Sequence, residues 1–142
     1  INLFQSGLYN QNIVFHRNFS ENIEPIYVDY PKLKQVLINL FYNAIESMPN
    51  GGELIMGIYP EGNEMVTISI KDTGGGIPPE MFTNIFNPFF TTKGSGTGLG
   101  LPICRKIMEM HSGKIQIENN VGKGVTVFIH LPLQKVCDYT KK

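Results

Sequence analysis

Three glycine-rich motifs in the second half of this 142-residue chain, placed after one amphipathic helix, constrain its fold more than any other feature. The motifs are Asp72-Thr73-Gly74-Gly75-Gly76, Gly96-Thr97-Gly98-Leu99-Gly100-Leu101 and Gly122-Lys123-Gly124. The helix carries Asn39 and Asn43, whose four-residue spacing places both amides on one face. In this order the patterns predict one pocket with a metal-binding amide, a fixed carboxylate and flexible backbone around phosphates. We therefore expect an ATP-binding domain.

The composition suits a compact domain and removes several classes of partner. Hydrophobic residues make up 42% and charged residues 17% of the chain, which argues against extensive disorder. Lys+Arg and Asp+Glu number 12 each, so no net charge favours nucleic acid or an anionic membrane. No apolar run is long enough to cross a bilayer, and no signal peptide opens the sequence. Cys104 and Cys137 lack metal-site spacing, and we expect reduced thiols in a cytoplasmic protein.

The sequence begins at Ile1 without an initiator Met, and we expect it to be a piece of a longer polypeptide. Residues 1–10 are interpreted as the remnant of a helix that leads from a preceding domain. Residues 11–134 are interpreted as the ATP-binding catalytic domain and residues 135–142 as a polar C-terminal tail.

Hydrophobic periodicity predicts the elements of this domain. Apolar residues recur at helical spacing from Leu33 to Met48, between Pro31 and the breaker Pro49-Asn50-Gly51-Gly52. Further helices are expected at residues 101–110 and, briefly, near 80–84. Strands are expected at residues 12–19, 25–28, 53–59, 65–71, 114–118 and 125–131. Because strands and helices come in blocks rather than in strict alternation, we predict an α+β fold. It should have a mixed sheet of about five strands with about three helices on one face.

The polar residues of the helix and of the first glycine motif each allow two explanations. An asparagine oxygen is a neutral ligand for Mg²⁺, whereas two boundary amides could equally bond to backbone. Asp72 could accept a hydrogen bond from the adenine amine, with Gly74 and Gly76 close to the base and Ile77 as an apolar wall. A tight turn capped by Asp72 is the alternative.

The second glycine motif leads directly into a predicted helix, and backbone amides at a helix N-terminus form an anion site. Lys93 and Arg105 are candidate phosphate-contacting cations, and a flexible linker is the alternative. Neither a P-loop nor a Gly-x-Gly-x-x-Gly motif in a βαβ unit is present, so phosphates must be held by another scheme.

With these residues laid out, the chain resembles the catalytic ATP-binding domain of bacterial two-component sensor histidine kinases. That Bergerat fold is shared with gyrase-type, mismatch-repair and chaperone ATPases. The resemblance rests on five segments: residues 35–46 resemble the asparagine box, 72–78 the first glycine box, 85–93 the phenylalanine box, 96–101 the second glycine box and 122–124 the third.

The resemblance implies a two-layer α/β sandwich that binds ATP between the long helix and a mobile lid over roughly residues 87–99. It assigns Mg²⁺ to Asn43 and adenine recognition to Asp72. The catalytic candidates are Asn39, Asn43 and Lys93. The other cofactor-binding candidates are Gly74, Gly76, Ile77, Gly96, Thr97, Gly98, Leu99, Gly100, Leu101, Arg105 and Thr126.

Three positions depart from the family pattern. Glu46 stands where many members have a basic residue, which gives Lys93 and Arg105 more weight as phosphate contacts. Val125 follows the third glycine box where Thr is usual, so the adenine-side contact is shifted to Thr126. Asn87 replaces a frequent Glu, and little consequence is expected.

Asn39 separates kinase from hydrolase within the resemblance. Hydrolytic relatives place a Glu at this position as general base, whereas an amide cannot take a proton, so we expect phosphoryl transfer to a histidine and slow hydrolysis. His16, His111 and His130 are each expected to be structural, and the acceptor to lie outside the chain. A hydrolytic ATPase and an ATP-binding module without transfer remain alternatives.

The resemblance also implies partners. These are a helical dimerisation and phosphoacceptor domain of the same parent protein and, downstream, a response regulator receiver domain. The fragment itself should be a monomer that contacts neither nucleic acid nor membrane. Its parent should be a homodimer, and an anchor at the inner membrane is left open.

Overall fold

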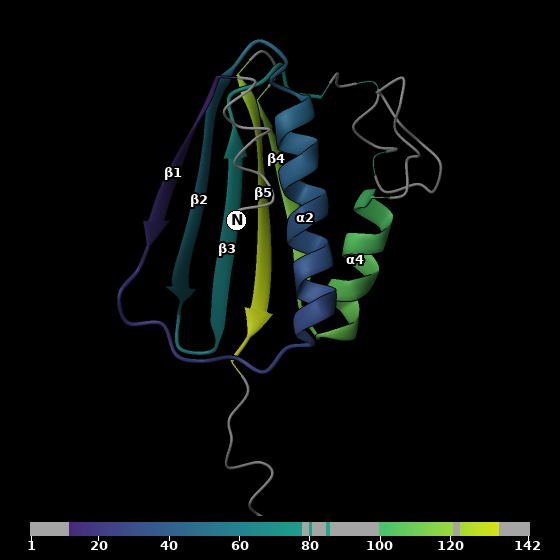
Figure 1. Cartoon of the computed structure of the whole chain (residues 1–142). Coiled ribbons are helices and arrows are strands. Elements are labelled where there is room, and N and C mark those ends of the chain that lie inside the picture. The colour runs from purple at the N-terminus through teal and green to yellow at the C-terminus, as the bar shows by residue number, and fades with distance from the viewer. Residues whose placement is uncertain (1–11, 78–79, 81–84, 86–99, 121–122, 134–142) are drawn as a thin grey trace, which may run out of the picture.

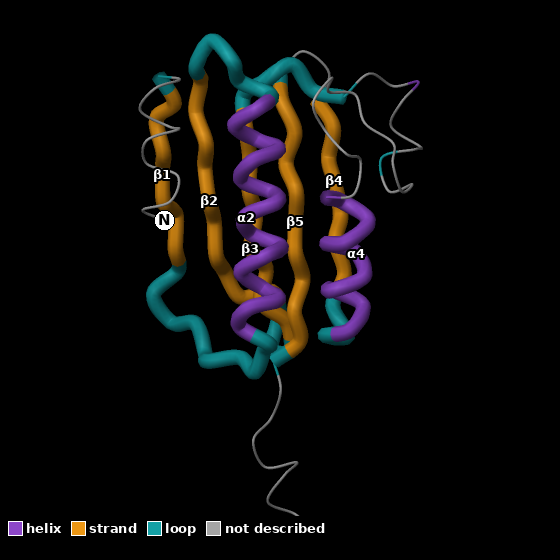
Figure 2. The backbone as a smooth tube through the Cα atoms, turned by 45° about the vertical axis from the view of Figure 1, so that its right-hand side comes forward, coloured by secondary structure: helices purple, strands orange, loops and turns teal. Residues whose placement is uncertain are grey.

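The computed structural model describes residues 12–77, 80, 85, 100–120 and 123–133. Five strands form one mixed sheet in the order β1-β2-β3-β5-β4, and the two described helices lie together on one face (Figure 1, Figure 2). The elements are β1 (Ile13–Phe19), α2 (Tyr30–Glu46), β2 (Gly52–Glu61), β3 (Met65–Asp72), α4 (Gly100–Met110), β4 (Lys114–Asn120) and β5 (Gly124–Pro132). The predicted α+β architecture is confirmed.

Two of the strand pairs, β2–β3 and β4–β5, join strands that are adjacent in the sequence. β1 pairs with β2 in parallel, with α2 in the connection between them, and all other neighbours are antiparallel. The expected strand at residues 25–28 is wrong, because these residues belong to an irregular segment between β1 and α2. Ile26 and Val28 pack against the core, but Pro25 offers no amide hydrogen for a ladder, so burial alone produced the apolar pattern.

Several predictions fall on residues that the structure does not describe. They are the helix remnant at 1–10, the short helix near 80–84 apart from Glu80, the lid at 87–99 and the tail at 135–142.

The first helix begins and ends at identifiable signals. The side chain of Asp29 caps α2 by accepting from the Lys32 amide at 3.2 Å, and Pro31 occupies the first turn, where no amide hydrogen is needed. The chain leaves the helix at Ser47. These local rules explain why α2 spans the expected residues.

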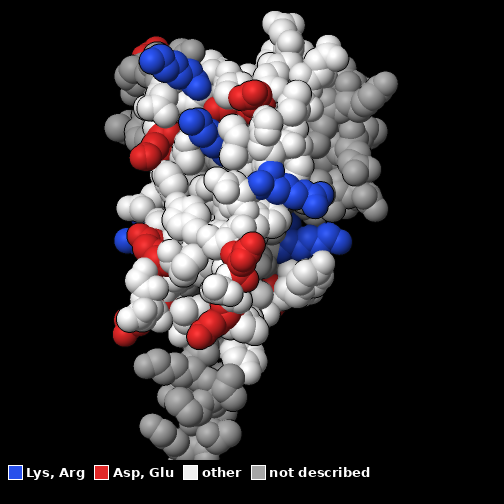
Figure 3. Space-filling model, turned by 90° about the vertical axis from the view of Figure 1, so that its left-hand side faces the viewer, with Lys and Arg blue, Asp and Glu red and all other residues white. Residues whose placement is uncertain are grey.

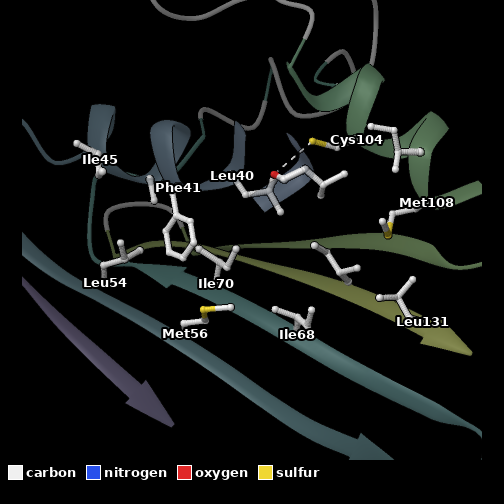
Figure 4. Close-up of a cluster of buried hydrophobic side chains, with 14 of the residues drawn as sticks. Leu40, Phe41, Ile45, Leu54, Met56, Ile68, Ile70, Cys104, Met108 and Leu131 are labelled. Carbon is white, nitrogen blue, oxygen red and sulfur yellow. Dashed lines mark hydrogen bonds between the residues drawn. The ribbon is translucent and has the colours of Figure 1, made fainter. Parts of the chain in front are cut away.

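The core lies between the helices and the sheet (Figure 4). From α2, Leu40, Phe41 and Ile45 pack toward β2 and β3, where Leu54, Met56, Ile68 and Ile70 are buried. From α4, Cys104 and Met108 fill the space toward Leu131 of β5. Burial of this set is the main stabilising contribution to the fold.

The other face of the sheet carries no described helix. Figure 3 views the molecule from the β1 side, where charges of both signs are interspersed over the described residues. None of the described helices is long and apolar enough to cross a membrane.

Candidate functional site

Three polar side chains, spaced four residues apart, form a row along α2 and just past its end. They are Asn39, Asn43 and Ser47. Asn39 donates from Nδ2 to the Cys104 Sγ of α4 at 3.8 Å. A Cβ on Gly100, the first residue of α4, would stand 3.9 Å from Asn43 Nδ2. A Cβ on Gly74 would stand 2.7 Å from Ser47 Oγ. The loop after β3 and the start of α4 therefore both reach the C-terminal half of α2.

The Asp72 carboxylate is fixed at the end of β3. Its Oδ1 accepts from the Gly74 amide at 2.9 Å and from the Val125 amide at 3.3 Å, and the residue is only 6% exposed. Gly124 makes this arrangement possible: its φ is +109°, and a Cβ there would overlap the backbone of Asp72. Gly124 therefore allows β5 to lie against Asp72.

Backbone of the first glycine motif lies against α2 and β2. Gly74 has no room for a side chain beside Ser47, and Gly76 adopts φ +80°. The Thr73 hydroxyl accepts from the Glu53 amide at 2.9 Å. The motif is thus a shaped loop rather than a linker, and Asp72 combines the turn-capping role with that of an oriented carboxylate.

Ile77 is held by a residue that the sequence interpretation did not identify. Asn119 of β4 accepts from the Ile77 amide at 2.7 Å and donates to the Ile77 carbonyl at 2.6 Å. A weak signal was present, because Asn119 continues the alternation of Ile115 and Ile117 on the helix-facing side of its strand.

Thr126 is not brought to this site. It pairs with Lys71, one residue before Asp72, so its side chain projects from the sheet face opposite to the one on which Asp72 and Ile70 meet α2. The neighbouring Val125 lies at the site, where its backbone amide donates to Asp72 Oδ1. A shift of one residue along a strand moves a side chain to the other face, which accounts for the difference.

The second glycine motif is described only at its end. Gly100 and Leu101 begin α4, and Arg105 is exposed one turn later. Lys93, Gly96, Thr97, Gly98 and Leu99 lie outside the described residues, as does Gly122. The structure therefore gives the position of the α4 N-terminus, beside Asn43, without the loop that precedes it.

Cys104 explains the orientation of Asn39. The buried thiol donates to the Val36 carbonyl at 3.8 Å and receives the Asn39 amide, and burial raises the pKa of this thiol to about 11. Asn39 therefore joins α2 to α4 through a neutral thiol.

The three histidines all have protein partners. His16 lies 3.6 Å from Glu53, and His130 is buried between Glu61 and Gln116. His111 bonds to the Ile107 carbonyl through Nδ1 at 2.8 Å, so its Nε2 is the acceptor for the Asp29 amide at 3.0 Å. The hydrogen bonds of His111 and His130 thus join separate elements of the fold, whereas the contact of His16 lies on the surface.

Comparison with known proteins gives a consistent result. A family model described as "Histidine kinase-, DNA gyrase B-, and HSP90-like ATPase" matches residues 28–135. Sporulation kinase C of Bacillus subtilis (strain 168) is 44% identical over 133 residues, which cover 93% of this chain but only 31% of the kinase.

Solved structures give the same picture. The nucleotide-free catalytic domain of histidine kinase ThkA superposes with a TM-score of 0.82 at 39% identity, covering 92% of this chain and 87% of that one. Histidine kinase ThkA in complex with response regulator protein TrrA matches with a TM-score of 0.78 at 36% identity, covering 94% of this chain and 38% of the kinase.

Proposed function

The chain belongs to the histidine kinase-, DNA gyrase B- and HSP90-like ATPase family, and from this premise we propose that it binds Mg-ATP and phosphorylates a histidine on a separate helical domain of its parent protein. The observation that carries the proposal is that two segments, the glycine loop after β3 and the start of α4, meet at the C-terminal half of α2. A fixed carboxylate with its glycine loop and the N-terminus of α4 reach one row of amide and hydroxyl groups. Together these groups can bind a nucleobase, a metal ion and phosphates.

In this proposal Asp72 selects the base. A carboxylate held by two backbone amides keeps a fixed direction, so it can accept a hydrogen bond from the adenine amine without further ordering. Gly74 and Gly76 let the backbone approach the base, and Ile77 is the apolar wall against its face.

Asn43 is proposed as the metal ligand. In the described part of the chain, no group of three or more His, Cys, Asp or Glu side chains could hold a metal ion by itself. A single amide oxygen fits Mg²⁺, which keeps several waters and takes its other ligands from the phosphates of its nucleotide. Bound there, the ion would neutralise phosphate charge during transfer.

The phosphates are proposed to lie at the start of α4. The helix N-terminus at Gly100 and Leu101 favours negative charge. Gly96, Thr97, Gly98 and Leu99, which lie outside the described residues, are proposed as further phosphate contacts. Lys93 and Arg105 are the candidate cations. Catalysis would then consist of positioning and charge neutralisation.

Asn39 favours transfer over hydrolysis. A general base must accept a proton, and this side chain is an amide whose Nδ2 is directed to Cys104. We therefore propose slow hydrolysis and retention of the γ-phosphoryl group for a histidine. The similar solved structures are named histidine kinases, which supports this choice within the family.

The proposed partners follow from the relatives. The chain spans 31% of the length of sporulation kinase C. We propose that the acceptor histidine belongs to another part of the parent protein. One similar kinase is solved with a response regulator, and we propose a receiver domain as the downstream partner here. The fragment should be monomeric and the parent a homodimer.

The test is phosphoryl transfer in trans. The fragment is incubated with γ-³²P-labelled Mg-ATP, with and without a separately produced helical domain of its parent. Acid-labile label on the added domain alone would support the kinase. Rapid release of inorganic phosphate would indicate a hydrolase instead, and ATP binding with neither reaction would indicate a binding module.

A further inference from the structure

The glycine loop after β3 is joined to β4 through one side chain. Asn119 pairs its planar amide with the peptide edge of Ile77, as a neighbouring strand would, although the residues are 42 positions apart. Only this orientation of the amide places its donor at a carbonyl and its acceptor at an amide hydrogen. Resting on the proposed function, we propose that Asn119 is a positioning residue that sets the nucleobase preference of the site.

The same position of the β4–β5 hairpin also holds the carboxylate. Asn119 is the cross-strand partner of Val125, and the Val125 amide donates to Asp72 Oδ1 at 3.3 Å. One cross-strand pair, Asn119 and Val125, therefore holds both residues proposed to contact the base. These are Asp72, at the edge of the base, and Ile77, against its face. We therefore expect a substitution that breaks the Asn119 side-chain bonds to move Ile77 relative to Asp72.

Packing alone does not explain an asparagine here. Ile115, Ile117 and Asn119 alternate on the helix-facing side of β4, where an apolar side chain would fit the pattern. An apolar residue would leave the Ile77 amide and carbonyl without these partners, and a half-buried polar side chain is retained where it is hydrogen-bonded. The residue type thus serves the loop.

Asn119→Asp tests this role with little change in size. The variant keeps an acceptor for the Ile77 amide but places a carboxylate oxygen against the Ile77 carbonyl, which it repels. Asn120→Asp is the matched control, since it makes the same charge change at the next residue, which is exposed and projects from the opposite face of the strand.

The measurements are the dissociation constants of Mg-ATP, Mg-GTP and Mg-tripolyphosphate, with thermal unfolding of each variant alongside. We expect Asn119→Asp to weaken ATP about tenfold, the scale of a lost hydrogen-bonded contact, and to leave tripolyphosphate unchanged. The preference for ATP over GTP should fall, while Asn120→Asp keeps all three affinities.

Two results for Asn119→Asp would overturn the proposal. One is a preference for ATP over GTP equal to that of the control. The other is an equal loss of affinity for all three ligands, because that indicates a merely structural role.

If Asn119→Asp does not fold, hydrogen exchange of the Ile77 amide in the unmodified chain tests the proposal instead. Exchange as fast as in a free peptide would overturn the proposal, whereas protection that increases with ATP would support it. No ATP binding by the unmodified chain would overturn the proposed function itself, and this is seen before any variant is made.

Discussion

At the scale of single residues, Asp72 has both a structural and a proposed binding role, and one substitution separates them. Asp72→Asn keeps an oxygen for the Gly74 and Val125 amides but replaces the other oxygen with a donor. The free energy of unfolding should change by less than about 1 kcal/mol. ATP should bind at least about tenfold more weakly because the new donor opposes the adenine amine. Calorimetric titration with ATP and GTP measures this, and an unchanged preference would remove Asp72 from base recognition.

Gly124 and Gly62 both have positive φ, but only Gly124 lies against other backbone. A Cβ at Gly124 (φ +109°) would overlap the Asp72 carbonyl, whereas nothing lies within 4 Å of one at Gly62 (φ +66°). Gly62→Ala should cost about 1 kcal/mol of unfolding free energy, the strain of the left-handed conformation alone. Gly124→Ala should cost more than about 2 kcal/mol and also weaken ATP, because β5 must move from Asp72. Urea unfolding of both variants tests this, and equal losses would mean that the contact with Asp72 is loose.

At the scale of elements, α2 depends on a cap that can be removed separately from its tertiary link. The Asp29 side chain accepts from the Lys32 amide, while its backbone amide donates to His111 at the end of α4. Asp29→Ala removes only the first contact and should lower the unfolding free energy by about 1 kcal/mol. Asp29→Asn, which also caps, should be close to neutral. Chemical denaturation compares them, and a loss as large in Asp29→Asn would show that charge rather than capping matters.

The elements that could be predicted are those with local signals. The long helix has its apolar period and a proline in its first turn, and each hairpin joins strands that are adjacent in sequence. The strand predicted at residues 25–28 does not form. Partial burial of Ile26 and Val28 gives these residues the apolar pattern of a strand, but the segment is not paired with a strand of the sheet.

The sequence indicates which types of residue form the site better than it indicates which residues contact one another. Asp72 and its glycines carry recognisable motifs, but Asn119 meets Ile77 across 42 positions and Val125 meets Asp72 across 53. Such contacts depend on the strand order, in which β5 lies between β3 and β4. The residues that make the contacts do not by themselves indicate this order. The side chains of Thr126 and Val125 lie on opposite faces of β5. To predict which of the two faces the site, the register of the strand must be known.

At the scale of the whole molecule, two distant groups have pKa values shifted in opposite directions, so each makes the stability of the fold depend on pH at one end of the range. Hydrogen bonds from Thr67 and then His130 lower the pKa of Glu61, so its contribution is present at neutral pH and is lost as the pH falls through the lowered value. Burial raises the pKa of Cys104 from its ordinary value near 9 to about 11. Its contribution is therefore present below pH 9 and lost as the pH rises toward 11, because only the unfolded chain then releases the thiol proton.

Urea unfolding from pH 3 to 11 should therefore give a free energy that declines at both ends. The alkaline loss from Cys104 is on the order of 2–3 kcal/mol. Tyr59, whose pKa is raised first by burial and then by Glu61, adds to it in the same direction. Cys104→Ala should lower stability at pH 7 through the cavity it leaves but flatten the curve between pH 9 and 11. Thr67→Val removes the larger cause of the Glu61 shift and should flatten only the acid side. If Cys104→Ala declines as steeply in alkali as the unmodified chain, the buried thiol does not contribute to the alkaline loss of stability.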